Sequence, residues 1–400
     1  MAWMISEERL DPNQKEIFNS RIDKNLWIKG FAGSGKSVLL IHKLRRIIKS
    51  NPNVETCVVV FTWSMIDMFK TGMKELEMPS SIPVITYFKF KSEGSFRTYD
   101  YIFCDEVQDL PESILNLMKS KLKPNGKIVV AGDSNQSIYE MAPGIQEPTV
   151  NPKQIGVIIN AEEVSLNYVH RVTRTIINAI QKLLPSTNIW SANREFTPPD
   201  RSIALCMADF EEHETEYIYK EALKGPDSSG RDRKETSVIL LPTHRDIIKF
   251  IQLLLRQLNA PEWVEKKDGY GKNPDYIDMN KHLRSNRIRI QYIGNGNGSL
   301  EDAEDNKDII LMTYHSSKGL DFDNVFLPFL SWDLFISNYR ADVLLMVAMT
   351  RSKKNLYISY TGNPHHLIEK FISDKNIVTD IPITKPTTST FHTEEIDLGF

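Results

Sequence analysis

The sequence has 400 residues, of which 41% are hydrophobic and 25% charged, and its formal net charge at pH 7 is −3. These values lie near the averages of folded domains and exclude a disordered chain or collagen-like repeats. Because the charge is nearly balanced, any nucleic-acid contact needs a local groove rather than a basic surface. No apolar run approaches the roughly 18 residues of a membrane span, and Cys57, Cys104 and Cys206 stand far apart. We therefore expect a cytoplasmic protein that has neither a membrane contact nor a disulfide framework.

Short apolar runs alternate with longer segments of helical period along the chain. The runs that we expect to form strands cover residues 26–28, 57–62, 101–104, 127–131, 203–206, 237–241, 309–313, 325–327 and 355–360. After the first run, an apolar stripe that begins at Val38 predicts a helix from about Ser37 to Lys49. Such alternation is typical of parallel sheets with crossover helices, so the predicted fold class is α/β.

The series of strands and helices pauses between about residues 144 and 155, where Pro143, Pro148 and Pro152 interrupt regular structure. We therefore expect a first domain over residues 1–155 and a second over residues 156–373. The second domain would contain a short, polar, loop-like insertion at residues 259–307. Residues 374–400 form an acidic tail rich in Thr and Pro, which is either an untethered terminus or a segment that docks on a partner.

A phosphate-loop pattern, GxxxxGK[ST], lies between the first predicted strand and its helix. It reads Gly30-Phe31-Ala32-Gly33-Ser34-Gly35-Lys36-Ser37. In such a loop the glycines let backbone N–H groups wrap the phosphates, Lys36 reaches the β- and γ-oxygens, and Ser37 ligates Mg²⁺. The alternative is a glycine-rich turn with a solvated lysine.

Two carboxylates, Asp105 and Glu106, end the predicted strand at residues 101–104. An α/β sheet delivers catalytic groups to its ligand crevice at such a strand end. Asp105 would hold Mg²⁺ through water, and Glu106 would orient and deprotonate an attacking water. The alternative is a solvated turn.

Three more side chains are candidates for contact with a γ-phosphate. Gln136 follows the next predicted strand, at the same sheet edge, although its segment also reads as a plain turn. Arg171 and Arg351 lie in the second half of the chain and are candidates for arginines supplied across a domain cleft. Surface arginines are common, so position alone leaves that role open.

A possible single-strand groove is indicated by Trp63, Tyr87, Phe88 and His315, which would stack on bases or bind phosphates. Ordinary packing explains these residues equally well. Residues 287–292 alternate like a half-buried strand with a basic face, which would either guide a backbone phosphate or form a solvated hairpin.

These segments, in this order, resemble the motifs of superfamily 1A helicases of the UvrD/Rep/PcrA type over nearly all of residues 8–362. The matching segments are 10–14 (Q motif), 61–64 (Ia), 86–90 (Ib), 105–109 (II), 132–139 (III), Leu166 with 171–176 (IV), 313–322 (V) and 347–354 (VI). The resemblance implies two tandem RecA-like P-loop NTPase domains with parallel sheets. ATP and Mg²⁺ would bind in the cleft between these domains.

The resemblance also implies roles for single residues. Gln14 would read adenine, and His170 stands where the family has an aromatic residue that stacks on adenine. Asp321 replaces the usual glutamate near the ribose, and Arg171 and Arg351 match the family's paired arginines. The single-strand path would contain Thr62, Trp63, Thr86, Tyr87, Phe88, Met141, Thr313 and His315.

The chain departs from the family in two respects. Met141 and Ala142 stand where the family places a base-stacking tryptophan and an arginine, and the two large auxiliary insertions are reduced to residues 91–100 and 259–307. We expect an ATP-dependent motor, a helicase or translocase that moves 3′→5′ on single-stranded DNA. The alternative is a nucleotide-gated nucleic-acid sensor that regulates a partner, such as a nuclease, without unwinding. A GTP-binding switch is disfavoured because no NKxD sequence is present.

Overall fold

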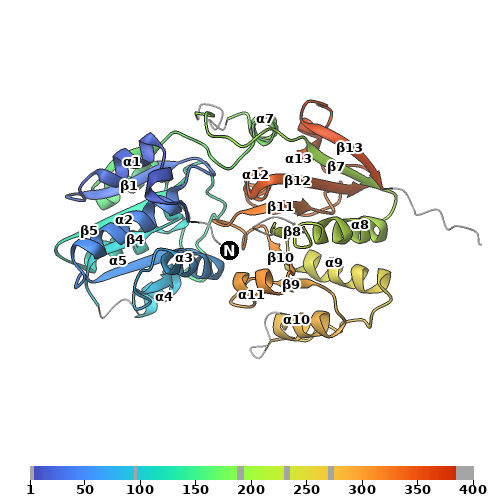
Figure 1. Cartoon of the computed structure of the whole chain (residues 1–400), viewed down its shortest axis with the longest axis horizontal. Helices are drawn as coiled ribbons and strands as arrows, with labels where there is room; N and C mark the ends of the chain where they lie inside the picture. Colours follow the sequence, from blue (N-terminus) through green and yellow to red (C-terminus); the bar gives the residue numbers. More distant parts are fainter. Residues whose placement is uncertain (1–3, 94–96, 187–192, 229–234, 269–273, 384–400) are drawn as a thin grey trace, which may run out of the picture.

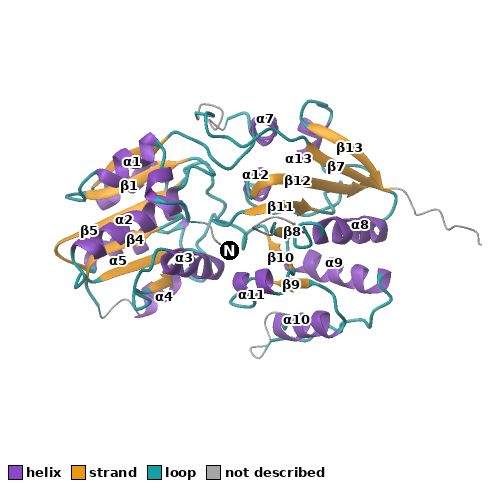
Figure 2. Cartoon of the chain, in the orientation of Figure 1, coloured by secondary structure: helices purple, strands orange, loops and turns teal. Residues whose placement is uncertain are grey.

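The computed structural model describes residues 4–93, 97–186, 193–228, 235–268 and 274–383. The chain forms two halves, each built around its own sheet, with the blue-to-cyan part of the chain in one and the green-to-red part in the other (Figure 1). Helices flank the strands in both halves (Figure 2). This arrangement confirms two tandem RecA-like α/β domains.

The first half alternates strands and helices from the amino-terminal end. Its strands are β1 (Asn25–Gly30), β2 (Thr56–Val60), β3 (Val84–Thr86), β4 (Tyr99–Cys104), β5 (Leu122–Gly132) and β6 (Ala161–Leu166). Its helices are α1 (Pro12–Asn19), α2 (Lys36–Ser50), α3 (Trp63–Glu75), α4 (Tyr87–Glu93), α5 (Glu112–Ser120) and α6 (Ile155–Ile159). Short 3-10 turns occur at Glu7–Arg9, Val107–Asp109 and Pro152–Gln154.

The first sheet has the strand order β3-β2-β4-β5-β1-β6, and its described pairings are all parallel. Strand β2 is buried along its whole length, as expected for a strand covered by helices on both faces. Because β4, β5 and β1 are neighbours and parallel, their carboxyl ends meet at one edge of the sheet. That edge positions the first group of site residues.

The boundary between the halves differs from the prediction. Strand β6 pairs with β1 from Asn25↔Ala161 to Gly30↔Leu166, so the first half extends at least to Leu166 rather than ending at residue 155. The prolines around residues 143–152 break regular structure without ending the domain. Strand β6 was missed because it is an edge strand that is mostly accessible to solvent, and it lacks an apolar run.

The second half contains the remaining elements. Its strands are β7 (Ile203–Ala208), β8 (Ser237–Leu241), β9 (Ile290–Tyr292), β10 (Ile309–Thr313), β11 (Phe322–Leu327), β12 (Ser352–Thr361) and β13 (Val378–Ile383). Its helices are α7 (Arg174–Leu183), α8 (Glu211–Leu223), α9 (His244–Gln257), α10 (Tyr276–Ser285), α11 (Leu300–Asp305), α12 (Ala341–Met349) and α13 (His366–Ile372). The sheet order is β13-β7-β12-β11-β8-β10-β9, and the described pairings are again parallel.

The prediction that residues 259–307 form a loop-like insertion is wrong. This segment contributes α10, β9 and α11 to the second half. Helix α10 buries Tyr276, Met279 and Leu283, which lie on one helical face. The amide of Asn280 satisfies the free edge of β9, since it accepts from the Tyr292 N–H at 2.8 Å and donates to the Tyr292 carbonyl at 3.0 Å. Strand β9 pairs in parallel with β10, so residues 287–292 do not form a hairpin. Residues 269–273 of this segment lie outside the described residues.

The predicted tail also contains regular structure. Strand β13 pairs with β7 from Val378↔Ile203 to Ile383↔Ala208, so the second sheet continues to Ile383, past the expected start of the tail at residue 374. An edge strand tolerates Pro382, which has no N–H to donate. Residues 384–400 of the predicted tail lie outside the described residues.

The two halves pack directly against each other. One apolar core cluster includes residues of both sheets, and the Ser64 hydroxyl at the start of α3 donates to the Ser316 carbonyl at 2.8 Å. Gly319 lies against Met65, because a Cβ at this glycine would be 3.1 Å from the methionine sulfur. In the part of the chain that the structure describes, no helix has the length and apolarity needed to cross a bilayer.

Candidate functional site

The phosphate loop joins β1 to α2 and is built on two glycines in left-handed backbone conformations. Gly33 has φ +75° and Gly35, the N-cap of α2, has φ +80°. A Cβ at Gly33 would lie 2.7 Å from the Arg171 Cβ, so only glycine allows the approach of that segment. The open amino end of a 15-residue helix thus faces the space above the loop, where its N–H groups favour an anion.

Lys36 and Ser37 begin α2 and face the same space. The Lys36 ammonium donates to the loop's own carbonyls of Gly30 at 3.0 Å and Phe31 at 3.1 Å. The Ser37 hydroxyl donates to Asp105 Oδ2. A phosphate is a stronger acceptor than a carbonyl, so the loop fits a nucleotide triphosphate.

Asp105 and Glu106 follow β4 and are both buried. The Glu106 N–H donates to Asp105 Oδ1 at 2.9 Å, and the Gln108 amide donates to Glu106 Oε2 at 2.6 Å. Glu106 has φ +53°, a left-handed conformation that is costly for a residue with a side chain and is typical of functional sites. The strand end therefore holds both carboxylates in defined orientations.

The two carboxylates have different proton affinities. Burial and the negative charge of Glu106 raise the pKa of Asp105 to about 6, against the opposing effect of Ser37 and Lys36. Burial also acts to raise the pKa of Glu106, but the charges of Lys318 and Lys36 outweigh it and leave that pKa below its usual value. Glu106 is therefore ionised at neutral pH, as a general base must be.

The pair of Ser37 and Asp105 also fits a magnesium ion. Hydroxyl and carboxylate oxygens are the ligands that Mg²⁺ prefers, and Mg²⁺ usually takes only one or two protein ligands beside substrate phosphates. Within the described residues, no cluster of three or more metal-binding His, Cys, Asp or Glu side chains occurs.

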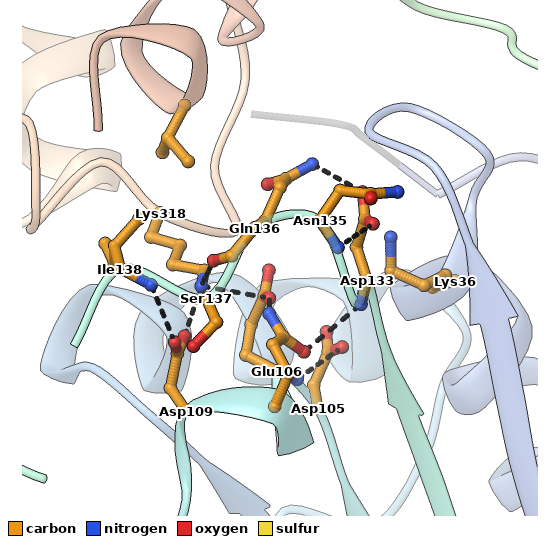
Figure 3. Close-up of polar contacts among 12 residues, drawn as sticks. Lys36, Asp105, Glu106, Asp109, Asp133, Asn135, Gln136, Ser137, Ile138 and Lys318 are labelled. Carbon is orange, nitrogen blue, oxygen red and sulfur yellow. Dashed lines mark hydrogen bonds and ion pairs between the residues drawn. The ribbon is translucent and has the colours of Figure 1, made fainter. Parts of the chain in front are cut away.

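Lys318, from the second half, reaches into the first half beside these carboxylates (Figure 3). Its side chain is fully buried, forms an ion pair with Asp109 and donates to the Gln136 carbonyl at 2.6 Å. Its ammonium also lies 3.7 Å from Glu106 Oε2. Burial raises the pKa of Asp109 to about 6 even though Lys318 acts in the opposite direction.

Gln136 and Arg351 meet between the two halves. Gln136 follows β5, donates to Asp133 Oδ2 at 2.9 Å, and accepts from the Arg351 guanidinium at 3.4 Å. Arg351, between α12 and β12, is buried and also donates to the Val347 and Leu320 carbonyls at 2.8 and 3.0 Å. Burial and the neighbouring Arg171 lower the pKa of Arg351 to about 9, so the guanidinium stays charged at neutral pH.

Arg171 lies on the connection between β6 and α7, next to the phosphate loop. It contacts Asp321 at 3.3 Å, and Lys353 contacts the other oxygen of this carboxylate at 3.1 Å. Burial acts to raise the pKa of Asp321, but the two cations lower it to about 2. The Arg171 Nε is buried without a hydrogen-bond partner among the described residues, as expected for a donor that awaits a ligand.

Gln14 and His170 lie at the other end of the loop. Gln14 completes a capping box with Asp11 and donates to the Ser34 carbonyl at 3.0 Å, which leaves one amide hydrogen and one oxygen lone pair for a ligand. His170 contacts Asp11 Oδ2 at 2.6 Å and stacks on Phe196 with ring centres 5.3 Å apart. The backbone N–H of His170 donates to the Gly33 carbonyl at 2.9 Å.

A pocket of about 550 Å³ collects these groups between the two halves. The predicted residues that line it are Gln14, Gly33, Gly35, Lys36, Ser37, Glu106, Gln136, His170, Arg171, Asp321 and Arg351. Gly30, Ser34 and Asp105 do not line it, although Asp105 accepts a hydrogen bond from Ser37, which does. Lys318 and Lys353 were not predicted as site residues, because their partners are distant in sequence and no charge pattern reveals them. Pro198 and Pro199, which also line the pocket, follow no motif.

A second, more open groove of about 850 Å³ also runs between the halves. Thr62, Trp63, Thr86, Tyr87 and Phe88 line it from the first half, and Thr313 and His315 line it from the second. Tyr87 is mostly packing, since it is buried, stacks on Phe61 at 4.9 Å, and donates to the Pro143 carbonyl. Seven of the eight predicted single-strand residues are thus brought together.

Met141 is the exception, because it does not line this groove. It forms an isolated antiparallel bridge with Pro148, outside the groove lining. The following Ala142 is buried, and its N–H donates to the Glu147 carbonyl at 2.8 Å. Glu140 and Pro143, on either side of this pair, do line the groove. Phe335, His244 and Asn295 do line the groove, but no sequence signal pointed to them.

Comparison with known families gives two matches. The model of the UvrD-like helicase C-terminal domain matches residues 272–363, and that of an AAA domain matches residues 14–142. The second match spans the phosphate loop and both carboxylates, whereas the first spans Lys318 and Arg351. No curated protein matches the chain significantly.

Proposed function

Since this chain belongs to the compact UvrD-like superfamily 1 helicases, whose domains hydrolyse ATP and bind nucleic acid, we propose that it is a motor that moves 3′→5′ on single-stranded DNA. ATP would bind in the pocket between the halves, and the strand would bind in the second groove. The direction and the preference for DNA rest on the resemblance.

One observation carries the proposal. A single pocket combines Lys36 and Ser37 of the phosphate loop with Glu106 from the same half and Arg351 from the other half. These are the parts that phosphoryl transfer to water needs: an anion cradle, a base, and a cation that reaches the transition-state charge from across a cleft.

Each residue has a distinct part in the proposed hydrolysis. Lys36 exchanges the Gly30 and Phe31 carbonyls for β- and γ-phosphate oxygens. Ser37 and Asp105 would hold Mg²⁺, and the bound ion would supply positive charge that neutralises the charge developing on the phosphates. Glu106, ionised at neutral pH, orients the attacking water and accepts its proton. Gln136 holds Arg351 toward the γ-phosphate, and Arg171 supplies the second positive charge.

Hydrolysis would be coupled to movement through contacts that join the halves. Lys318 contacts the loop that follows β4 and the backbone of Gln136, so it connects the pocket to the second half. The same second-half segment carries Thr313 and His315, which line the groove. Changes in the pocket are thereby transmitted to the strand-binding surface by relative motion of two rigid halves.

Steady-state ATP hydrolysis tests the proposal, with no nucleic acid and with single-stranded DNA, duplex DNA or single-stranded RNA. We expect stimulation by single-stranded DNA and complete loss of activity in Lys36→Ala. Lys24→Ala removes an exposed lysine near β1 and serves as the matched control. Hydrolysis that survives in Lys36→Ala would contradict the assignment of the pocket.

A second candidate is a nucleotide-gated sensor that controls a partner such as a nuclease. Met141 favours it, because this residue stands where the resembled family has a base-stacking tryptophan and it does not line the groove. Strand displacement by the purified chain alone, on duplexes with either a 3′ or a 5′ single-stranded tail, separates the two. Unwinding from the 3′ tail supports the motor, whereas ATP hydrolysis without displacement on either substrate favours the sensor.

A further inference from the structure

A short segment of the second half lines both the pocket proposed for ATP and the second groove. Residues 294–301, which we call the linking segment, follow β9 and include the start of α11. At one end Gly294 and Asn295 line the groove, and at the other end Leu300 and Glu301 line the ATP pocket. The linking segment lies outside all the motif segments of the sequence, so its place between the two cavities is a property of the fold.

The backbone of the linking segment is held in one shape. The Gly294 N–H donates to the Asn297 carbonyl at 3.0 Å, and the Asn297 N–H donates back to the Gly294 carbonyl at 2.8 Å. Gly298 has φ +72°, and a Cβ there would lie 2.4 Å from the Tyr292 carbonyl oxygen, so the turn packs directly on β9. Because the turn is rigid, a displacement at one end of the linking segment reaches the other end.

Helix α3 of the first half also extends from one cavity to the other. Trp63, at its start, lines the groove, whereas Met68 and Thr71, further along, line the ATP pocket. Helices α3 and α11 lie side by side where the two halves meet (Figure 1). Each half therefore contributes one element that touches both cavities, and these two elements contact each other.

Asp67 of α3 forms the direct hydrogen bond between these two elements. Its Oδ2 accepts the backbone N–H of Leu300 at 3.0 Å. That N–H lies in the first turn of α11, where it has no partner within the helix. Lys74 and Glu301 also join the two helices, at 3.4 Å, but they are 79% and 60% exposed, and an exposed ion pair is weak. Asp67 is partly buried and lines neither cavity, so it acts only through α11.

We propose that Asp67 is a positioning residue that couples the ATP pocket to the groove. By holding the start of α11 on α3, it makes the linking segment follow the first half when a bound nucleotide shifts the halves, and the groove lining at Gly294 and Asn295 moves with it. The inference rests on the proposed function, because it requires both ligands. It adds a contact at α3 to the contact that Lys318 makes after β4.

The test measures the coupling between the two ligands in the full chain. The affinity for a fluorescent single-stranded oligonucleotide is determined with and without a non-hydrolysable ATP analogue, and the larger value divided by the smaller is the coupling factor. Titration of the analogue with and without the strand must give the same factor. We expect Asp67→Ala to reduce the factor toward 1, by about 2- to 30-fold. The affinity for either ligand alone should stay at the wild-type value.

Two further variants separate coupling from a general loss of structure. Asp67→Asn keeps an oxygen that can accept the Leu300 N–H, so it should retain most of the coupling factor. Lys74→Ala removes the exposed pair between the same two helices and should behave as the wild-type protein does.

A factor that is unchanged in Asp67→Ala, or that falls as far in Lys74→Ala, overturns the inference and leaves the proposed function standing. The same holds if the wild-type protein binds both ligands with a factor of 1. If the wild-type protein binds no nucleotide or no single strand, the proposed function fails together with the inference.

Discussion

Replacement of Lys318 by methionine should destabilise the protein more than removal of a solvent-exposed ion pair between the two halves. The Lys318 ammonium is fully buried and forms an ion pair with Asp109, whose side chain is also fully buried. Lys318→Met leaves this carboxylate without its cation and the Gln136 carbonyl without its donor. Breaking a buried pair from one side costs about 3–5 kcal/mol.

The proton on Asp109 gives this prediction a second readout. Burial has already raised the pKa of Asp109 to about 6, and loss of Lys318 removes the main effect that opposes the rise. A carboxyl group whose pKa is raised on folding stabilises the folded state below its unfolded pKa, and this contribution is lost as pH rises through the folded pKa. The variant should therefore be closest to the wild-type protein at about pH 5 and should lose further stability toward pH 8.

Urea denaturation at several pH values measures the effect. Lys74→Met is the control, because Lys74 and Glu301 also join the halves, at 3.4 Å, but are 79% and 60% exposed. Such a pair contributes at most about 1 kcal/mol. The double variant Lys318→Met/Asp109→Asn removes both charges and should recover part of the loss. If Lys318→Met is no less stable than Lys74→Met, or shows no dependence on pH, the assignment of Lys318 is refuted.

Three further predictions concern the core, the phosphate loop and the groove. Glu214 accepts hydrogen bonds from the Phe329 N–H and the Ser359 hydroxyl, both at 2.6 Å, and burial raises its pKa to about 7. Protonation of Glu214 stabilises the folded protein by about 3 kcal/mol; this contribution is present below the unfolded pKa and lost as pH rises through 7. Melting curves of Glu214→Gln should therefore depend less on pH than those of the wild-type protein. Gly33→Ala should abolish ATP hydrolysis, measured by phosphate release, because the new methyl group would displace Arg171 and strain a left-handed backbone; wild-type rates would contradict this. Affinity for single strands, measured by fluorescence anisotropy, should fall by less than about tenfold between 50 and 200 mM salt. The reason is that no lysine or arginine lines the described groove, so that few counterions are released on binding. A steep decline would show phosphate contacts elsewhere.

Local sequence patterns were sufficient for the elements that chemistry or periodicity marks. The phosphate loop lies between β1 and α2, and Asp105 and Glu106 end β4, as predicted. These features depend on glycine conformation and on short buried runs, both of which are visible in a single sequence. Two edge strands were not predicted, because they lack such buried runs. Strands β6 and β13 are only partly buried, so their sequences lack a continuous apolar run.

By itself the sequence determined the α/β class, the phosphate loop and the order of the motifs, because each of these depends on residues that are close along the chain. Only the tertiary structure decided which distant side chains meet. Lys318 and Asp109 are separated by 209 residues, and they are in contact because the two halves pack against each other. The same packing brings Phe335 into one groove with residues of the first half. Neither outcome has a local signal, since burial and exposure at an interface arise only when both surfaces are folded.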